Sequence, residues 1–67
     1  MTQKQRILEY LQAGGELTRL DSWDKLGVIE APARISELRQ DGHLIRTARR
    51  RVTNRYSEQV SIAVWSL

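Results

Sequence analysis

Five arginines lie within the ten residues "RTARRRVTNR", which contain no acidic residue. They are Arg46, Arg49, Arg50, Arg51 and Arg55. Arginine neutralises phosphates, releases condensed counterions from duplex DNA and suits the negative potential of a narrow minor groove. An alternative interpretation is that these arginines only keep a hairpin soluble and protect its edge. Adjacent like charges repel, and a surface built for solubility alone would mix signs. The stretch is therefore predicted to bind a polyanion or an acidic partner.

The charge of the chain is unevenly distributed. Its 67 residues carry a formal net charge of +3 at pH 7. Residues 1–30 have four basic and five acidic side chains, whereas residues 31–67 have seven arginines and three acids. A polyanion is therefore expected to be attracted to the C-terminal half.

Other chemistry has little support in the sequence. The chain has no cysteine, and its single histidine, His43, has no acid at the spacing of a triad or metal cluster. No glycine-rich phosphate loop is present. We predict no enzyme activity, no metal, no cofactor and no small-molecule substrate. Apolar runs are too short to cross a bilayer, so no membrane contact is predicted. The absence of cysteine fits a reducing compartment, so a cytoplasmic location is predicted.

Two N-terminal helices are expected to support this basic region. Apolar residues at helical spacing predict a first helix from about residue 2 or 3 to 13, ended by Gly14 and Gly15. Thr18 can cap a second helix that ends at Gly27, with Asp21 reaching back as a shorter capping-box residue. Within this helix one face is predicted to enter the core. It contains Leu20, Trp23 and Leu26.

A third helix is predicted in "EAPARISELRQDG", with Pro32 in its first turn and Gly42 after its end. Ala31, Ile35 and Leu38 form its apolar stripe. The opposite face carries Ala33, Ser36, Glu37 and Gln40, and Arg34 and Arg39 flank it.

After Gly42 the apolar period changes from 3.6 to 2, which predicts a hairpin with strands near 43–50 and 59–66. The arginine-rich stretch is expected at its tip, with Thr53-Asn54 as the turn. Trp65 alternates with the apolar residues of its strand, so it either covers the open face of the hairpin or meets a partner. The whole, residues 1–67, is expected to form a single α+β domain.

The segment "LTRLDSWDKLGVIEAPARISELRQDGHLIRT" resembles the winged helix-turn-helix family, and in particular the small helix-turn-helix proteins of phages and prophages. The shared positions are Leu17-Thr18, Gly27, Ala33-Arg34-Ile35, Leu38-Arg39, Gly42 and Ile45. The likeness covers residues 5–47 by motif and the hairpin by arrangement. It implies three helices followed by a two-stranded antiparallel wing. It also implies binding of double-stranded DNA, with the third helix in the major groove and the wing on the backbone or in the minor groove.

Ten residues are predicted to contact DNA: Arg34, Ser36, Glu37, Gln40, Arg46, Arg49, Arg50, Arg51, Asn54 and Arg55. Ser36 and Gln40 could hydrogen-bond base edges, and Glu37 could accept from a cytosine amino group. The alternative for these three is an ordinary solvated helix face. Arg34, like Arg39, is as well explained by a structural ion pair. Among the wing arginines, Arg46 is expected to lie closest to the body and to support the third helix.

The leading hypothesis is a phage or prophage transcription regulator that works as a homodimer or beside a second DNA-bound protein, because one small module buries little surface. The alternative is a phage-encoded protein-interaction module, an inhibitor or adaptor, that docks its basic wing on an acidic surface of a host protein. RNA binding ranks third, since Tyr56 is the one aromatic residue near the arginines.

Overall fold

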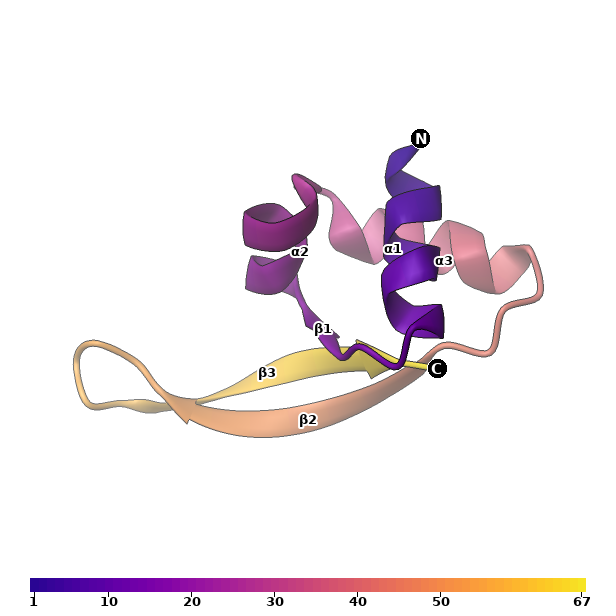
Figure 1. Ribbon diagram of the computed structural model, residues 1–67. Helices are drawn as coiled ribbons and strands as arrows, with labels where there is room; N and C mark the ends of the chain where they lie inside the picture. The colour runs from indigo at the N-terminus through magenta and orange to yellow at the C-terminus, as the bar shows by residue number, and fades with distance from the viewer.

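The computed structural model describes all 67 residues and contains three helices and three strands (Figure 1). In chain order they are α1 (Gln3–Gln12), β1 (Leu17–Thr18), α2 (Arg19–Leu26), α3 (Ala31–Gln40), β2 (Arg46–Thr53) and β3 (Gln59–Ser66). The helices gather over one end of the sheet, and the β2–β3 hairpin extends beyond them as a long arm (Figure 1). None of the three helices has the length and the apolar composition of a membrane span.

The predicted first helix is confirmed. A capping box begins α1, because the Thr2 hydroxyl accepts from the Gln5 amide at 3.2 Å and the Gln5 side chain accepts from the Thr2 amide at 2.9 Å. Its apolar stripe buries Ile7 and Leu11. Gly15 follows the helix at a place where a Cβ would lie 2.5 Å from the Tyr10 ring. A side chain at residue 15 would therefore push Tyr10 off the core.

The start and end of α2 follow the prediction with one correction. The Thr18 hydroxyl accepts from the Asp21 amide at 3.0 Å, as expected. Asp21 does not return a side-chain hydrogen bond to Thr18, because its carboxylate is one methylene shorter than that of the usual glutamate. Gly27 ends the helix with a φ of 67°, a left-handed conformation that favours glycine.

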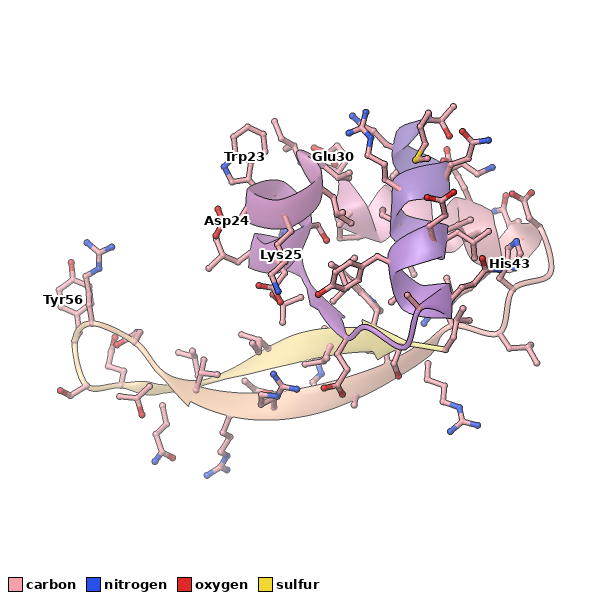
Figure 2. All side chains as sticks on the ribbon, in the orientation of Figure 1. Trp23, Asp24, Lys25, Glu30, His43 and Tyr56 are labelled. Atoms are coloured by element: carbon pink, nitrogen blue, oxygen red, sulfur yellow. The ribbon has the colours of Figure 1, made fainter.

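The prediction for the buried face of α2 was wrong. Leu20 and Trp23 are 69% and 54% exposed, and Trp23 points outward, away from α1 (Figure 2). Ser22 is buried instead, with its hydroxyl donating to the Thr18 carbonyl at 2.9 Å, and Leu26 is half-buried against the core. An eight-residue helix has few positions on which to read a period, and Val28, which follows the capping Gly27, is buried in the core instead.

The core stripe of α3 is confirmed, because Ala31, Ile35 and Leu38 are all buried and Pro32 lies in the first turn. Nine side chains from helices, loops and sheet form the core cluster. Trp65 is one of them, 6% exposed, on the same sheet face as its register partner Leu17. Of the two interpretations of Trp65, the structure therefore supports the one in which it covers the sheet.

The sheet differs from the predicted two-stranded hairpin in two respects. It has three strands in the order β1-β3-β2, because Leu17 and Thr18 pair with Trp65 and Val64 of β3. Two residues are too few to show a period of 2, so β1 could not be recognised from the pattern. In addition, β2 begins at Arg46 rather than near residue 43 and continues to Thr53.

This shift moves the arginines. Arg46, Arg49, Arg50 and Arg51 lie along β2, and only Arg55 belongs to the tip. The turn was predicted at Thr53-Asn54, one residue too early. In the structure Thr53 is the last residue of β2, and the tip spans 54–58, closed by a hydrogen bond from the Asn54 amide to the Glu58 carbonyl at 2.9 Å. The wing is therefore a long, curved hairpin whose basic residues lie mostly on β2, with a small tip, and it is not a basic loop (Figure 1).

Candidate nucleic-acid interface

The exposed face of α3 carries two polar side chains that have no partner within the protein. Ser36 and Gln40 are exposed, lie one helical turn apart, and make no side-chain hydrogen bond. Their donors and acceptors are therefore available to base edges without breaking an internal contact. Their exposure agrees with the sequence analysis, and their role in reading bases stays a prediction.

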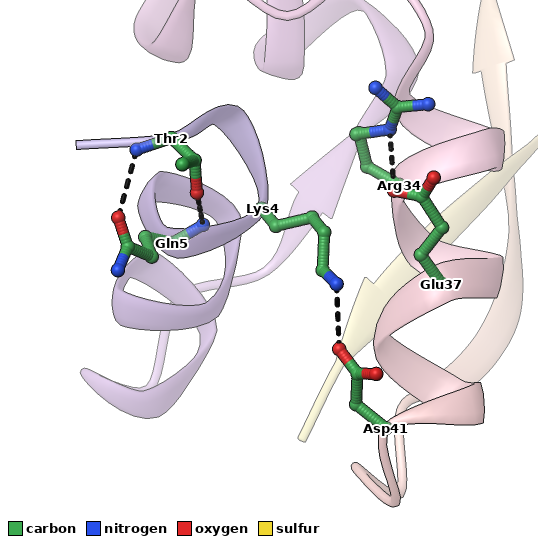
Figure 3. A network of polar contacts seen from close by, with 6 residues as sticks. All are labelled: Thr2, Lys4, Gln5, Arg34, Glu37 and Asp41. Carbon is green, nitrogen blue, oxygen red and sulfur yellow. Dashed lines mark hydrogen bonds and ion pairs between the residues drawn. The ribbon is translucent and has the colours of Figure 1, made fainter.

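Arg34 and Glu37 form an ion pair within α3 instead of acting as separate charges (Figure 3). The Arg34 Nε lies 2.9 Å from Glu37 Oε1, although it has no well-aligned hydrogen bond and is otherwise buried. The cation neutralises the acid beside it, so Glu37 repels a nearby phosphate less than a lone carboxylate would. The same pairing leaves the exposed face of α3 without an unpaired cation.

Arg39 fastens the end of α3 to the base of the wing. Its guanidinium donates to the Ile45 carbonyl from Nε at 3.1 Å and from Nη2 at 2.9 Å, and Nη2 also reaches the Thr47 hydroxyl at 2.7 Å. These bonds bridge the loop between α3 and β2. Arg39 therefore has a structural role, as one interpretation of the sequence had it, but through hydrogen bonds to Ile45 and Thr47 rather than through an ion pair.

We expect Arg39→Ala to lower the free energy of unfolding by about 1.5–3 kcal/mol, because it removes charge-assisted bonds to a part-buried carbonyl. Arg39→Lys should recover less than half of this loss, since an ammonium cannot reproduce the two-pronged contact. Urea unfolding followed by circular dichroism measures both values. Arg46→Ala is the control, because Arg46 is exposed and has no polar partner. A loss for Arg46→Ala as large as that for Arg39→Ala would contradict this role.

The arginines of β2 divide between the two faces of the sheet. Arg49 and Arg51 lie opposite Ala63 and Ser61, whereas Arg50 lies opposite Ile62 on the other face. Arg46 shares the face of Arg50. All four are exposed. The wing therefore offers cations on both surfaces.

The four β2 arginines also differ in what holds them. Arg50 reaches Glu16 at 3.2 Å, which ties β2 to the residue before β1 across the central strand. Arg51 makes one long contact of 3.4 Å with Gln59. Arg46 and Arg49 make no side-chain hydrogen bond or ion pair. Arg46 has no polar contact with α3, and the hydrogen bonds that join the end of α3 to the start of the wing come from Arg39.

Asn54 organises the tip of the wing. Its Oδ1 accepts from the Tyr56 and Glu58 amides at 2.9 and 3.1 Å, and its Nδ2 donates to the Glu58 carboxylate at 3.1 Å. These bonds use its polar atoms inside the tip. Arg55 is exposed and has no such partner, and Tyr56 projects outward at the end of the hairpin (Figure 2). The tip thus holds its shape through Asn54 and presents Arg55 and Tyr56.

The helical order, the short β1 paired with β3, and the long β2–β3 hairpin can be compared with known domains. A family model described as a winged helix-turn-helix domain matches residues 2–67. The chain belongs to this family. In this domain α2 and α3 correspond to the helix-turn-helix, and β2 and β3 correspond to the wing. Comparison with curated proteins and with solved structures gave no match.

Most cations on the helical body of this winged helix-turn-helix domain are already paired. Lys4 binds Asp41 at 2.7 Å and, mainly through this hydrogen bond, holds the pKa of Asp41 below its ordinary value (Figure 3). The Tyr10 hydroxyl similarly raises the pKa of Lys25, which lies 3.2 Å from it. Arg6 donates to the Leu26 carbonyl at 2.8 Å. The body thus uses its cations to join its own elements.

Arg19 is the exception, and the sequence prediction omitted it. It is the first residue of α2, is exposed, and makes no ion pair or side-chain hydrogen bond. Its position directly after the capping residue Thr18 was the signal that could have found it, because anions are favoured at a helix N-terminus. No group of three or more His, Cys, Asp or Glu side chains is arranged to hold a metal ion.

Proposed function

We propose that this winged helix-turn-helix domain binds duplex DNA with α3 in the major groove and the wing along the backbone or in the minor groove. The observation that carries the proposal is the contrast between paired body cations and the unpaired Arg46, Arg49 and Arg55 of the wing. Unpaired, exposed guanidinium groups can meet phosphates without first losing an internal partner. Arg50 and Arg51 would join them by releasing Glu16 and Gln59.

In this proposal, α3 reads the base edges. Gln40 suits adenine through its amide, and Ser36 can serve several bases. Glu37 would accept from a cytosine amino group, and Arg34 would reach a guanine or a phosphate, only after their mutual ion pair opens. Asn54 contributes indirectly by shaping the tip that carries Arg55. We therefore expect modest sequence preference from α3 and most of the affinity from the wing.

The biological role that we propose is transcription regulation in a phage or prophage. A single module of this size covers a short site, so useful specificity requires a second copy on a paired half-site or another DNA-bound protein. The resemblance of the helix-turn-helix segment to small phage proteins supports this role.

The test is fluorescence anisotropy of a mixed-sequence duplex titrated with the protein at several salt concentrations. If about four phosphates are neutralised, affinity should fall roughly a hundredfold between 50 and 200 mM salt. Selection from a random duplex library then reports whether α3 reads sequence. Absence of binding at 50 mM salt, or binding that does not respond to salt, would refute the proposal.

A second candidate function is docking of the basic wing on an acidic protein surface. It is favoured by the Arg34–Glu37 pair, which leaves α3 without an unpaired cation while the wing has several. Pull-down from nuclease-treated lysate separates the two functions. A stoichiometric protein partner that is lost with the wing arginines, in a protein that does not bind duplex, would select this candidate.

A further inference from the structure

An apolar groove of about 980 Å³ lies between α2, the turn before α3 and the hairpin. Its apolar walls include Leu20, Trp23, Ile29, Pro32, Val52 and Ile62. Ile29, like Leu20 and Trp23, is largely exposed. Apolar side chains gathered in one concave place on a small domain mark a site that another apolar group covers.

One wall of the groove is an open sheet edge. On that edge β1 pairs with Val64 and Trp65 only, so residues 59–63 of β3 have a partner strand on the β2 side and none on the other. Ile62 and Ala63 from this open segment line the groove. Unpaired backbone donors and acceptors along an edge are a template for an added strand.

The charges around the groove indicate what kind of strand fits. No acidic side chain lines it, and its one charged residue is the unpaired Arg19. A second copy of this chain would bring an identical cation and another arginine-rich wing to the same place, where like charges oppose association. DNA phosphates would gain little from a lining that is mostly apolar.

We propose that this groove binds an extended peptide segment of another protein, with apolar residues at alternate positions and an acidic residue near Arg19. The segment extends the sheet as a strand beside residues 59–63 and continues the line that β1 begins. Its alternate side chains enter the groove against Leu20 and Ile29, and its carboxylate pairs with Arg19. The site uses neither the reading face of α3 nor the wing arginines, so it does not rest on the proposed DNA binding.

The test begins with a display library of random 12-residue peptides selected on the whole protein. We expect enriched peptides to alternate apolar residues and to carry acids. Leu20→Asp should lower the affinity of the protein for a synthetic copy of the enriched peptide by at least about tenfold, because it places a charge in the apolar contact. Leu44→Asp is the matched control, because Leu44 is 86% exposed and outside the groove, and it should leave the affinity unchanged. Arg19→Glu should weaken binding about fivefold or more.

Hydrogen exchange and NMR locate the bound peptide independently of the variants. Binding should slow exchange of the amides in 59–63 that point away from β2 and shift the Trp23 indole resonance. The proposal would be overturned if selection on the wild type enriched no more peptides than selection on the Leu20→Asp variant. Enrichment of basic peptides, or equal affinity of the enriched peptide for the wild type and for Leu20→Asp, would also overturn it. Self-association of the wild type that Leu20→Asp abolishes would identify a second copy as the occupant, and duplex DNA that protects the same amides would identify DNA. Either result would also overturn it.

Discussion

Replacing Arg49 and Arg51 together with alanine is expected to weaken duplex binding about 25-fold at 150 mM salt. Both side chains project from the same face of β2, are exposed, and have no acidic partner. Loss of two phosphate contacts should reduce the slope of log affinity against log salt by about 1.8, and each contact contributes roughly fivefold at this salt concentration. Anisotropy titrations of the variant and the wild type between 50 and 200 mM salt measure both quantities.

The matched control is the double variant Lys4→Ala, Lys25→Ala, which removes the same two charges from the helical body. Lys4 binds Asp41 and Lys25 binds Tyr10, so neither is offered to a ligand. We expect a change of less than about threefold, because the lost long-range attraction is screened within about 8 Å at physiological salt. Equal losses in the two double variants would show that net charge, rather than the wing, determines affinity.

Trp65→Ala is expected to cost about 3–5 kcal/mol of unfolding free energy, whereas Trp23→Ala should cost less than about 1 kcal/mol. Trp65 is buried in the nine-residue core beside Leu17, so truncation leaves a cavity. Trp23 is 54% exposed, and water fills the space that it vacates. A domain of 67 residues is stable by roughly 3–10 kcal/mol, so Trp65→Ala should remove a large share of its stability and Trp23→Ala a small one.

Urea unfolding followed by far-ultraviolet circular dichroism measures both tryptophan variants. Trp65→Phe should restore part of the lost stability, because it refills most of the cavity. Equal costs for the two alanine variants would contradict the assignment of Trp65 to the core and Trp23 to the surface. A larger loss of stability for Trp23→Ala than for Trp65→Ala would support the orientation of α2 that the sequence pattern favours, in which Trp23 is buried.

Local signals in the sequence predicted the helices well. The cap at Thr18, the left-handed Gly27 and the proline in the first turn of α3 act over a few residues, so their effects do not depend on distant parts of the chain. The stripe of Ala31, Ile35 and Leu38 was also predicted, because ten residues are enough to define a helical period.

The candidate interface was predicted only in part. Ser36 and Gln40 lie on the exposed face of α3 as expected, and the basic character of the hairpin was evident from composition. Which side chains form hydrogen bonds or ion pairs with one another was not evident. Glu16 binds Arg50 across 34 positions of sequence, and the Arg39 contacts depend on how the loop after α3 folds back. Such pairings follow from three-dimensional proximity, which spacing along the chain does not encode.

The sequence by itself determined the family, the order of the elements, the core stripe of α3 and the basic half of the molecule, because periodicity, caps and charge are local properties. Tertiary structure decided which tryptophan is buried, where β2 begins, and that β1 exists at all. It also decided which arginines remain unpaired. These outcomes depend on how the helices pack on the sheet, since a short helix or a two-residue strand has no stable orientation until a neighbouring surface supplies one.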